Sequence, residues 1–508
     1  MRGAGPLTRP GVEAALLAAL GAAAALALLV GEGGPLPVAM RMAYALVSAL
    51  AVGSAIAYWG YLYARRTARV DLWAVLLLFS ALFFAANGIL APGSIAMSPS
   101  RAELALRVLL LLAVGLAASR LAYLLVSPGE WAAVAKSLAA ARVQATRIPL
   151  VLLVAAGVWA LRVYGASQGL VLSHAGDVMT EVSGVASAGI QLALLGRPLL
   201  LFLGAVLAMD RRPRRRLLGI AIVAGELVLA VLWARRLLLE VVVVLLIVGL
   251  RNGRRVRLRQ LALYGAMGAF AILVMWPFMF HLRGVAERAG LYGTDFAGRA
   301  DTLVTQVLPE ALVTFDLGAS FTAGSEYLDN VRERSRTLDL LLDVMVAHRD
   351  GVPFMYGQAF LAAMVASIPR AAWPGKERLM ASETWQVEDL IERHYGLPPV
   401  DMTSTVLTQG YADGGAVGVV LYMALLGGML GLCERALVRA RSALIGIAVY
   451  ALGVSLAVQV EANVTDLLVV ARPIAALLLA DWLCGRWIER AASVPWLRPR
   501  LRRPGWAT

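Results

Sequence analysis

The chain alternates between long apolar runs and short polar connections from residue 11 to residue 485. A helix needs about 20 mostly apolar residues to cross the hydrocarbon core of a bilayer. Runs of this kind predict about twelve transmembrane helices, so the expected fold class is all-α, a polytopic membrane protein. The predicted helices cover residues 11–30, 38–62, 70–90, 103–126, 148–166, 185–209, 217–234, 237–250, 261–280, 411–432, 442–460 and 466–485.

One long polar stretch separates the ninth and tenth predicted helices. The predicted domains are helices 1–9 (1–280), a loop or lobe with amphipathic helices (281–410), helices 10–12 (411–485) and a basic tail (486–508). Within the loop, TLDLLLDVMVAH (337–348) is amphipathic, and FLAAMVASI (360–368) is apolar but too short to span a bilayer. This second segment is either a re-entrant or interfacial helix against the membrane helices or the core helix of a small lobe.

The basic residues predict an orientation. If the N-terminus is cytoplasmic, the cytoplasmic connections and tails hold 27 lysines and arginines, whereas the short outer connections hold only Arg101, Arg235 and Arg236. Lys and Arg collect in the cytoplasmic loops of membrane proteins. Both termini are therefore expected in the cytoplasm, and the large loop is expected on the outer side.

Composition narrows the function classes. The net charge of +14 would suggest nucleic-acid binding in a soluble protein, but here the cytoplasmic loops account for it and no nucleic-acid partner is expected. Cys433 and Cys484 lie at predicted cytoplasmic ends of helices, which does not support an extracellular disulfide framework. The four scattered histidines have no metal-ligand spacing, so no metal is predicted.

Charged residues inside predicted helices need a physical reason, because burying a charge in a bilayer is costly. Arg197 and Arg472 lie well within their helices and are candidates for a polar cavity, with Glu226 and Glu240 as natural salt-bridge partners. Arg120 lies near a cytoplasmic helix end, where a long side chain usually reaches back to the interface. Structural pairing and direct function both stay open for this group.

Four segments, in the same order, resemble those of the bacterial O-antigen (oligosaccharide repeat-unit) polymerases. They are WARRLLLEVVVVLL (233–246), RSRTLDLLLDVM (334–345), IPRAAWPGK (368–376) and TSTVLTQGYADGGAVGVVLYMALLGG (403–428). In the third, Pro369 and Pro374 stiffen the backbone between Arg370 and Lys376. In the fourth, Gly415 and Gly418 allow close backbone approach, and simple helix packing is the alternative role.

The resemblance implies a membrane glycosyltransferase at the periplasmic face of the bacterial inner membrane. Such an enzyme joins oligosaccharide repeat units carried on undecaprenyl diphosphate into O-antigen or another surface polysaccharide. Its expected partners are the lipid-linked glycans, the bilayer and a chain-length regulator protein. No cofactor is expected, because the diphosphate linkage already holds the energy for the transfer.

The candidate site residues follow from the resemblance and from charge. The arginines and lysine expected to bind the diphosphate by forked or charge-assisted hydrogen bonds are Arg235, Arg236, Arg336, Arg370 and Lys376, with Arg472 as a lining residue of the same cavity. The candidates for the acceptor side, where a general base would act, are Asp401, Glu383, Glu326 and His394.

Three other function classes are weighed against this one. An O-antigen ligase shares the architecture, but DMTSTVLTQ (401–409) lacks the histidine that ligases carry before the Gly-x-x-Gly helix. A glycosyltransferase that uses a lipid monophosphate sugar would be expected to place acidic residues in a larger first outer loop than GEGGPLP (31–37). A transporter or flippase is disfavoured because the sequence shows no inverted repeat.

Overall fold

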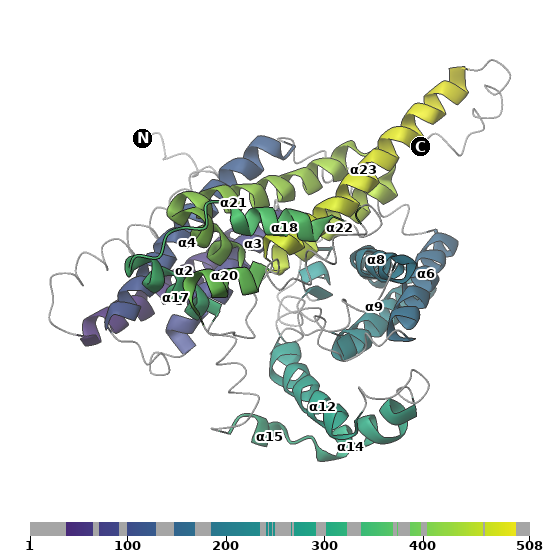
Figure 1. Ribbon diagram of the computed structural model, residues 1–508. Helices are drawn as coiled ribbons and strands as arrows, with labels where there is room; N and C mark the ends of the chain where they lie inside the picture. Colours follow the sequence, from purple (N-terminus) through teal and green to yellow (C-terminus); the bar gives the residue numbers. More distant parts are fainter. Residues whose placement is uncertain are drawn as a thin grey trace, which may run out of the picture.

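The computed structural model describes the greater part of the chain. The described residues are 37–64, 71–90, 99–128, 147–167, 184–233, 240–241, 243–245, 247–248, 266, 269–290, 301–322, 337–368, 373, 387–397, 404–460 and 463–493. Every regular element within these ranges is a helix (Figure 1), as the apolar pattern predicts. The first predicted helix, 11–30, lies outside the described residues.

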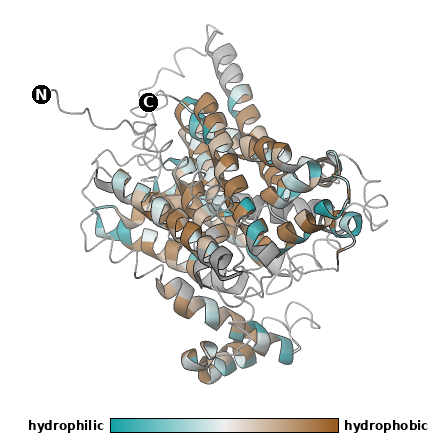
Figure 2. Cartoon of the chain, turned by 90° about the vertical axis from the view of Figure 1, so that its left-hand side faces the viewer, coloured by the Kyte–Doolittle hydropathy of each residue, from teal (hydrophilic) through white to brown (hydrophobic). Residues whose placement is uncertain are grey.

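Within the described residues, nine long helices lie on predicted membrane segments. They are α2 (Pro37–Ala64), α3 (Leu72–Leu90), α4 (Pro99–Val126), α6 (Ile148–Ser167), α8 (Gly184–Ala208), α9 (Pro213–Trp233), α21 (Val406–Arg439), α22 (Ala443–Val458) and α23 (Val464–Ser493). Two described helical segments, Glu103–Val126 and Val406–Arg439, are long and apolar enough to cross a membrane, and several others are apolar but shorter. Figure 2 shows how widely hydrophobic residues extend along these helices. The total number of crossings stays a prediction.

The main core forms where α21 packs along α4, with α2, α3 and α22 around the pair. Two glycines of α21 make this contact close. A Cβ on Gly427 would lie 2.0 Å from the carbonyl oxygen of Ser119, and one on Gly431 would lie 2.8 Å from that of Tyr123. Small residues of this kind let the backbones of membrane helices approach each other. Gly427 and Gly431 thus have a helix-packing role of the kind considered for Gly415 and Gly418.

A second group of helices, α6, α8 and α9, has its own apolar cluster and encloses buried charges. Arg162 Nη1 donates to both carboxylate oxygens of Glu226, at 2.9 and 3.0 Å. Arg197 pairs with Glu240, and both side chains are buried. The expected pairing of Arg197 with an acidic partner is thus present, whereas Glu226 binds Arg162 and neither of the two arginines for which it was considered.

Arg120 does not reach toward an interface as expected. It is 7% exposed, and its guanidinium donates to Asp71 at 3.1 Å while lying 4.7 Å from the centre of the Trp73 ring. The expectation fails because Asp71, at the start of α3, offers a charge partner inside the bundle. A paired and stacked guanidinium can remain buried, whereas an unpaired one cannot.

The helix predicted to end at residue 280 continues further. A π-helical turn, η1 (Ala271–Met275), leads directly into α12 (Trp276–Arg288). A second π turn, η3 (Leu303–Val307), leads into α14 (Leu308–Thr314), and the short α15 (Leu317–Ser320) follows. These elements pack on each other through a small apolar cluster of their own and form an arm at the lower edge of Figure 1.

Three further helices from the predicted loop lie against the bundle. They are α17 (Thr337–Arg349), α18 (Gln358–Ser367) and α20 (Val387–Tyr395). The first contacts α4 and α21, and α18 contacts α21 and α23. Ala359, Ala362 and Ala363 of α18 belong to the same buried core as the long helices. The apolar segment at 360–368 therefore packs against the long helices and does not form the core of a separate lobe.

Candidate functional site

Helix α21 is broken near its beginning, and the break is the centre of the candidate site. Gly414 (φ −164°, ψ 27°) and Gly415 (φ 60°, ψ −140°) leave the helical conformation. In a continuous helix, residues eight apart are separated by about 12 Å. Here a Cβ on Gly418 would lie 1.9 Å from the carbonyl oxygen of Gly410. The short segment before the break therefore folds back onto the start of the long segment after it, and only glycine fits at this contact.

Asp413, the last residue before the break, joins α21 to α18. Its carboxylate accepts the backbone N–H groups of Ala359 and Phe360, both at 3.0 Å, and the hydroxyl of Tyr422. The first N–H groups of a helix have no partner within the helix, and a negative charge there is favoured. Asp413, which is 6% exposed, therefore fixes where α18 begins. Its oxygens are already occupied by donors, which indicates a positioning role.

The segment that connects α17 to α18 lies directly over the break. Met355 N donates to the carbonyl of Ala412 at 2.8 Å. The Phe354 ring occupies the space beside Gly415, where a Cβ would approach it to 2.9 Å. His348 stacks on the other side of this ring, with 3.8 Å between centroids. Gly415 is thus required twice, for its positive φ and for the room it leaves to an aromatic side chain.

Two more helices converge on the same place. Gln409, just before the break, accepts the N–H of Val464 at 2.8 Å and so holds the first residue of α23. Tyr395, at the end of α20, donates its hydroxyl to the carbonyl of Ala412 at 3.0 Å. Burial raises the pKa of Tyr395 above its usual range, so its hydroxyl stays protonated as the donor. The break thus assembles α17, α18, α20 and α23 around one short stretch of backbone.

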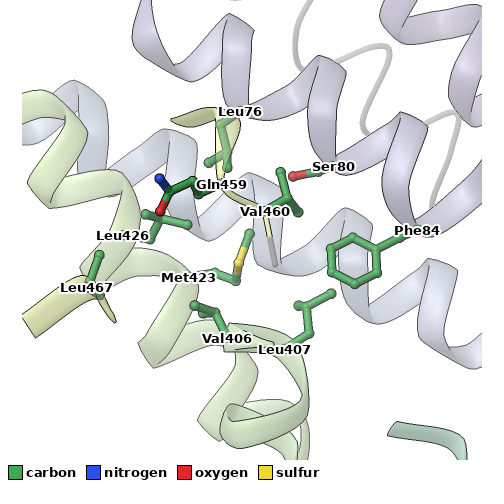
Figure 3. Close-up of a pocket in the computed structure, with 10 residues that line it drawn as sticks. All are labelled: Leu76, Ser80, Phe84, Val406, Leu407, Met423, Leu426, Gln459, Val460 and Leu467. Carbon is green, nitrogen blue, oxygen red and sulfur yellow. The ribbon is translucent and has the colours of Figure 1, made fainter. Parts of the chain in front are cut away.

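A small cavity lies among α3, α21 and α23 (Figure 3). Its volume is about 20 Å³, and its lining includes Phe84, Met423 and Leu467 together with the polar side chains of Ser80 and Gln459. A cavity needs a volume of roughly 10–15 Å³ to hold one water molecule. This space can therefore hold a water molecule or two, and no sugar ring or lipid chain fits in it.

Most of the predicted site residues lie outside the described residues. These are Asp401, Glu383, Glu326, Arg235, Arg236, Arg336, Arg370 and Lys376. Their places in the sequence relate some of them to the break. Arg336 immediately precedes α17, Arg370 follows Ile368 at the end of α18 by two residues, and Asp401 precedes the buried Ser404 by three. Their roles stay proposals.

Two predicted residues are described. His394, in α20, donates through Nε2 to the carbonyl of Pro353 at 2.8 Å, so it supports the segment above the break. Arg472 lies in α23, is partly buried, and precedes Pro473 within the helix. Among the described residues, Arg472 has no ion pair. Nothing in these contacts assigns His394 a part in proton transfer.

The residues at the break that the sequence analysis did not single out are Asp413, Tyr411, Tyr356 and His348. Asp413 carried the clearest signal, since it is an acidic residue in an otherwise apolar run. In the described ranges, no group of three or more His, Cys, Asp and Glu side chains could hold a metal ion.

Comparison with known proteins identifies one family. Residues 332–471 match the family model described as "Putative O-antigen polymerase". The matched range runs from α17 through the broken α21 to the first part of α23, and it contains the whole assembly around the break. This confirms the resemblance seen in the sequence. Neither the curated proteins nor the solved structures gave a match.

Proposed function

Taking the O-antigen polymerase match over residues 332–471 as the premise, we propose that this chain joins lipid-linked oligosaccharide repeat units into a surface polysaccharide. The proposed donor is a glycan on undecaprenyl diphosphate, and the acceptor is a repeat unit on the same lipid. The reaction takes place at the periplasmic face of the bacterial inner membrane. The single observation that carries the proposal is the family match.

The geometry supports this proposal through the position of the matched segment. Helix α17 contains most of RSRTLDLLLDVM, α18 ends directly before IPRAAWPGK, and both helices contact α21. Asp413 fixes the start of α18, and the basic segment follows the end of α18 directly. A loop that must hold a charged ligand needs rigid support of this kind.

The reaction needs one bond to form and one to break. A hydroxyl oxygen of the acceptor sugar attacks the anomeric carbon of the donor, and the bond from that carbon to the diphosphate oxygen breaks. The lipid diphosphate leaves with the electron pair, and the hydroxyl proton passes to a base. The protein must stabilise the growing negative charge on the diphosphate, for which arginine is well suited.

We assign the diphosphate to Arg370 and Lys376, with Arg336, Arg235 and Arg236 as further ligands and Arg472 lining the same space. Each candidate is a cation expected on the outer side or within a helix that contacts the loop. For the acceptor, Asp401 and Glu383 are the first candidates, followed by Glu326 and His394. Asp401 stands closest in sequence to the buried start of α21, at Ser404 and Thr405.

The test uses a strain that lacks the gene and carries a plasmid copy. Wild type should restore long polysaccharide ladders on a gel, and Arg370→Ala should not, with equal amounts of protein in the membrane. Arg288→Ala is the matched control, because Arg288 is an exposed arginine of α12 whose contact with Glu310 is a surface ion pair of little energetic value. Long ladders from Arg370→Ala would contradict the assignment.

The same strain separates the related activities. Loss of a polymerase leaves lipopolysaccharide that carries a single repeat unit, whereas loss of a ligase leaves none. Loss of a flippase would prevent repeat units from reaching the periplasm at all. A deletion strain without single-repeat lipopolysaccharide would therefore contradict a polymerase and favour one of these two alternatives.

A further inference from the structure

Tyr356 has an unusual backbone and an unusually open side chain. Its φ is 49°, and it is the one non-glycine residue with positive φ in the described part of the chain. Its side chain lies on the surface, with the residue 79% exposed. Positive φ is unfavourable for a bulky residue and persists only where the surroundings enforce it. Tyr356 and Gly357 (φ 89°) are the central residues of a type I′ turn closed by the hydrogen bond from Gln358 N to Met355 O, and this turn needs positive φ at both positions, where a bulky residue is rarely found.

A set of hydrogen bonds holds this backbone in place. Met355 N donates to Ala412 O at 2.8 Å, and Gln358 N donates back to Met355 O at 3.2 Å. The ring of His394 donates to Pro353 O at 2.8 Å, and His348 Nδ1 donates to Val352 O at 2.9 Å. The turn is therefore fixed from α17, α20 and α21 at once. It presents the Tyr356 ring outward from a rigid base.

The ring belongs to an aromatic cluster. Phe354 lies edge-on to Tyr356, with centroids 6.4 Å apart and planes at 90°, and edge-on to Tyr411 at 6.0 Å. His348 stacks beneath Phe354. The exposed ring and hydroxyl of Tyr356 thus stand on a partly buried aromatic base formed by Phe354, His348 and Tyr411.

We infer that Tyr356, supported edge-on by Phe354, is a platform on which a sugar ring of the glycan substrate stacks. One face of a pyranose ring is lined by C–H groups with slight positive charge, and an aromatic face is negative. The polar groups around the platform can donate to and accept from the sugar hydroxyls. This inference rests on the proposed function, because it places the glycan over the α21 break.

An aromatic side chain that anchors the protein at the membrane interface is the competing explanation. The exposed neighbours of Tyr356 favour a sugar. Those from Arg349 to Gln358 are Arg349, Asp350, Gly351, Pro353 and Gln358, which include two charged residues and an amide, and the exposed Leu361 lies in the first turn of α18. A tight turn held by hydrogen bonds from three helices also fixes the ring before a ligand arrives, from which a binding platform gains affinity and an interfacial anchor does not.

Binding to the purified full-length protein in lipid nanodiscs tests the platform. The probe is the soluble oligosaccharide repeat unit released from the surface polysaccharide of the strain that carries the gene, measured by calorimetry. Tyr356→Phe keeps the ring and should bind within about twofold of wild type. Tyr356→Gly removes the ring, and we expect affinity to fall about fivefold, the effect of one stacked aromatic contact.

Tyr356→Gly also keeps the test independent of folding. Glycine accepts positive φ without strain, so this variant should melt at or above the wild-type temperature. Phe321→Ala is the matched control, because it removes an exposed ring from the arm after α15 and should leave binding unchanged. Equal affinity for wild type and Tyr356→Gly overturns the platform.

Two outcomes separate this inference from the proposed function. If wild type builds polymer in cells and Tyr356→Gly binds the oligosaccharide as wild type does, the platform is wrong and the polymerase stands. If wild type neither binds the oligosaccharide nor restores polymer, the proposed function is wrong and the platform falls with it. A Tyr356 ring quenched by brominated lipids but unaffected by the oligosaccharide would identify an interfacial anchor and overturn the platform.

Discussion

The two ends of α21 carry the same hydrogen-bonding arrangement in different surroundings. At one end, Asp413 accepts two N–H groups from the start of α18 and the hydroxyl of Tyr422. At the other end, Glu434 accepts the N–H of Leu72, the first residue of α3, and the hydroxyl of Tyr123. In each case a buried carboxylate on α21 caps the start of a helix that is distant in sequence, and a tyrosine completes the arrangement.

The surroundings decide what each end can do. The Glu434 end is a continuous helix packed in a region that includes Arg120 and Trp73, both buried. The Asp413 end is broken by two glycines and covered by a turn whose aromatic side chains remain partly or largely exposed. The hydrogen-bonding arrangement therefore serves packing alone at the Glu434 end. At the Asp413 end it positions a surface that can bind a ligand.

Capping from a neighbouring helix recurs elsewhere in the described residues. Asp481, on α23, accepts the N–H groups of Arg441 at 2.9 Å and Ser442 at 2.8 Å and so caps α22. Gln409 does the same for α23. Water cannot satisfy helix ends that are buried in a bilayer or in a helix bundle, so another side chain must do it. These caps set the helix ends more firmly than apolar packing could.

The largest effect is expected from Glu434→Ala. It leaves the N–H of Leu72 and the hydroxyl of Tyr123 without their partner in a fully packed region, and each unsatisfied buried donor costs about 1–3 kcal/mol. We expect little protein to accumulate and a melting temperature in detergent well below that of wild type. Glu434→Gln, which keeps an acceptor of the same size, should recover part of the loss. Normal accumulation of Glu434→Ala would show that this end is not needed for folding.

Asp413→Ala should separate the two ends. This truncation leaves three hydrogen-bond donors without their acceptor. Gln358, directly before the donor Ala359, is exposed, and the nearby Phe354 is half-buried, so water can replace part of the lost bonding. We expect a smaller loss of stability, about 1–3 kcal/mol, with protein still present in the membrane. Polymer on gels should fall tenfold or more, because α18 and the segment after it lose their position. Full-length ladders from this variant would mean that the Asp413 end is no more specialised than the Glu434 end.

Gly415→Ala tests the break itself. The new methyl group would meet the Phe354 ring at 2.9 Å and stand on a backbone with φ of 60°, which costs about 1–2 kcal/mol. We expect shorter polymer at nearly normal protein level. Gly428→Ala is the matched control, since it lies in the same helix with no atom within 4 Å of its added methyl group. A Gly428→Ala protein should equal wild type or melt slightly higher, because alanine favours a helix.

The smallest effect is expected from Tyr395→Phe, which removes one hydrogen bond to Ala412 and should lower the free energy of unfolding by about 1 kcal/mol. The pH dependence has a defined sign. Burial raises the pKa of Tyr395 in the folded state, so its contribution is complete below about pH 10, the ordinary value for the phenol. As the pH rises further, wild type should lose stability and the difference from Tyr395→Phe should shrink. A difference that grows above pH 10 in melting experiments would contradict this cause.

The helix positions could be predicted from the sequence because each apolar run is long enough to indicate a helix without information from the rest of the chain. Predicted and observed ranges differ by only a few residues for helices such as α6 and α22, whereas α21 starts earlier and ends later than expected. The Asp413 bonds could not be predicted in this way. They join residues 53 and 54 positions apart, and their donors are backbone groups that every residue carries. The sequence shows a charged residue, Arg120, within a predicted helix. Its partner Asp71, 49 positions away, could not be identified from the pattern.

The candidate site was only partly accessible to sequence reasoning. The motifs directed the analysis to the part of the chain that the family model matches, because residues 332–471 include the whole of each of the three later segments. Tyr356 gave no signal, since positive φ at a non-glycine residue has no signature in the sequence. The cations assigned to the diphosphate depend on the resemblance and remain to be tested by mutation.

Reconstitution tests the central claim most directly. The purified chain in nanodiscs is mixed with undecaprenyl-diphosphate-linked repeat units, without nucleotide, and both glycan length and released lipid diphosphate are measured. We predict glycans of two or more repeat units, with one undecaprenyl diphosphate released for each new linkage, and a tenfold or greater loss for Arg370→Ala. Folded wild-type protein that yields neither product, or that joins repeat units only to added lipid A-core, would contradict the account.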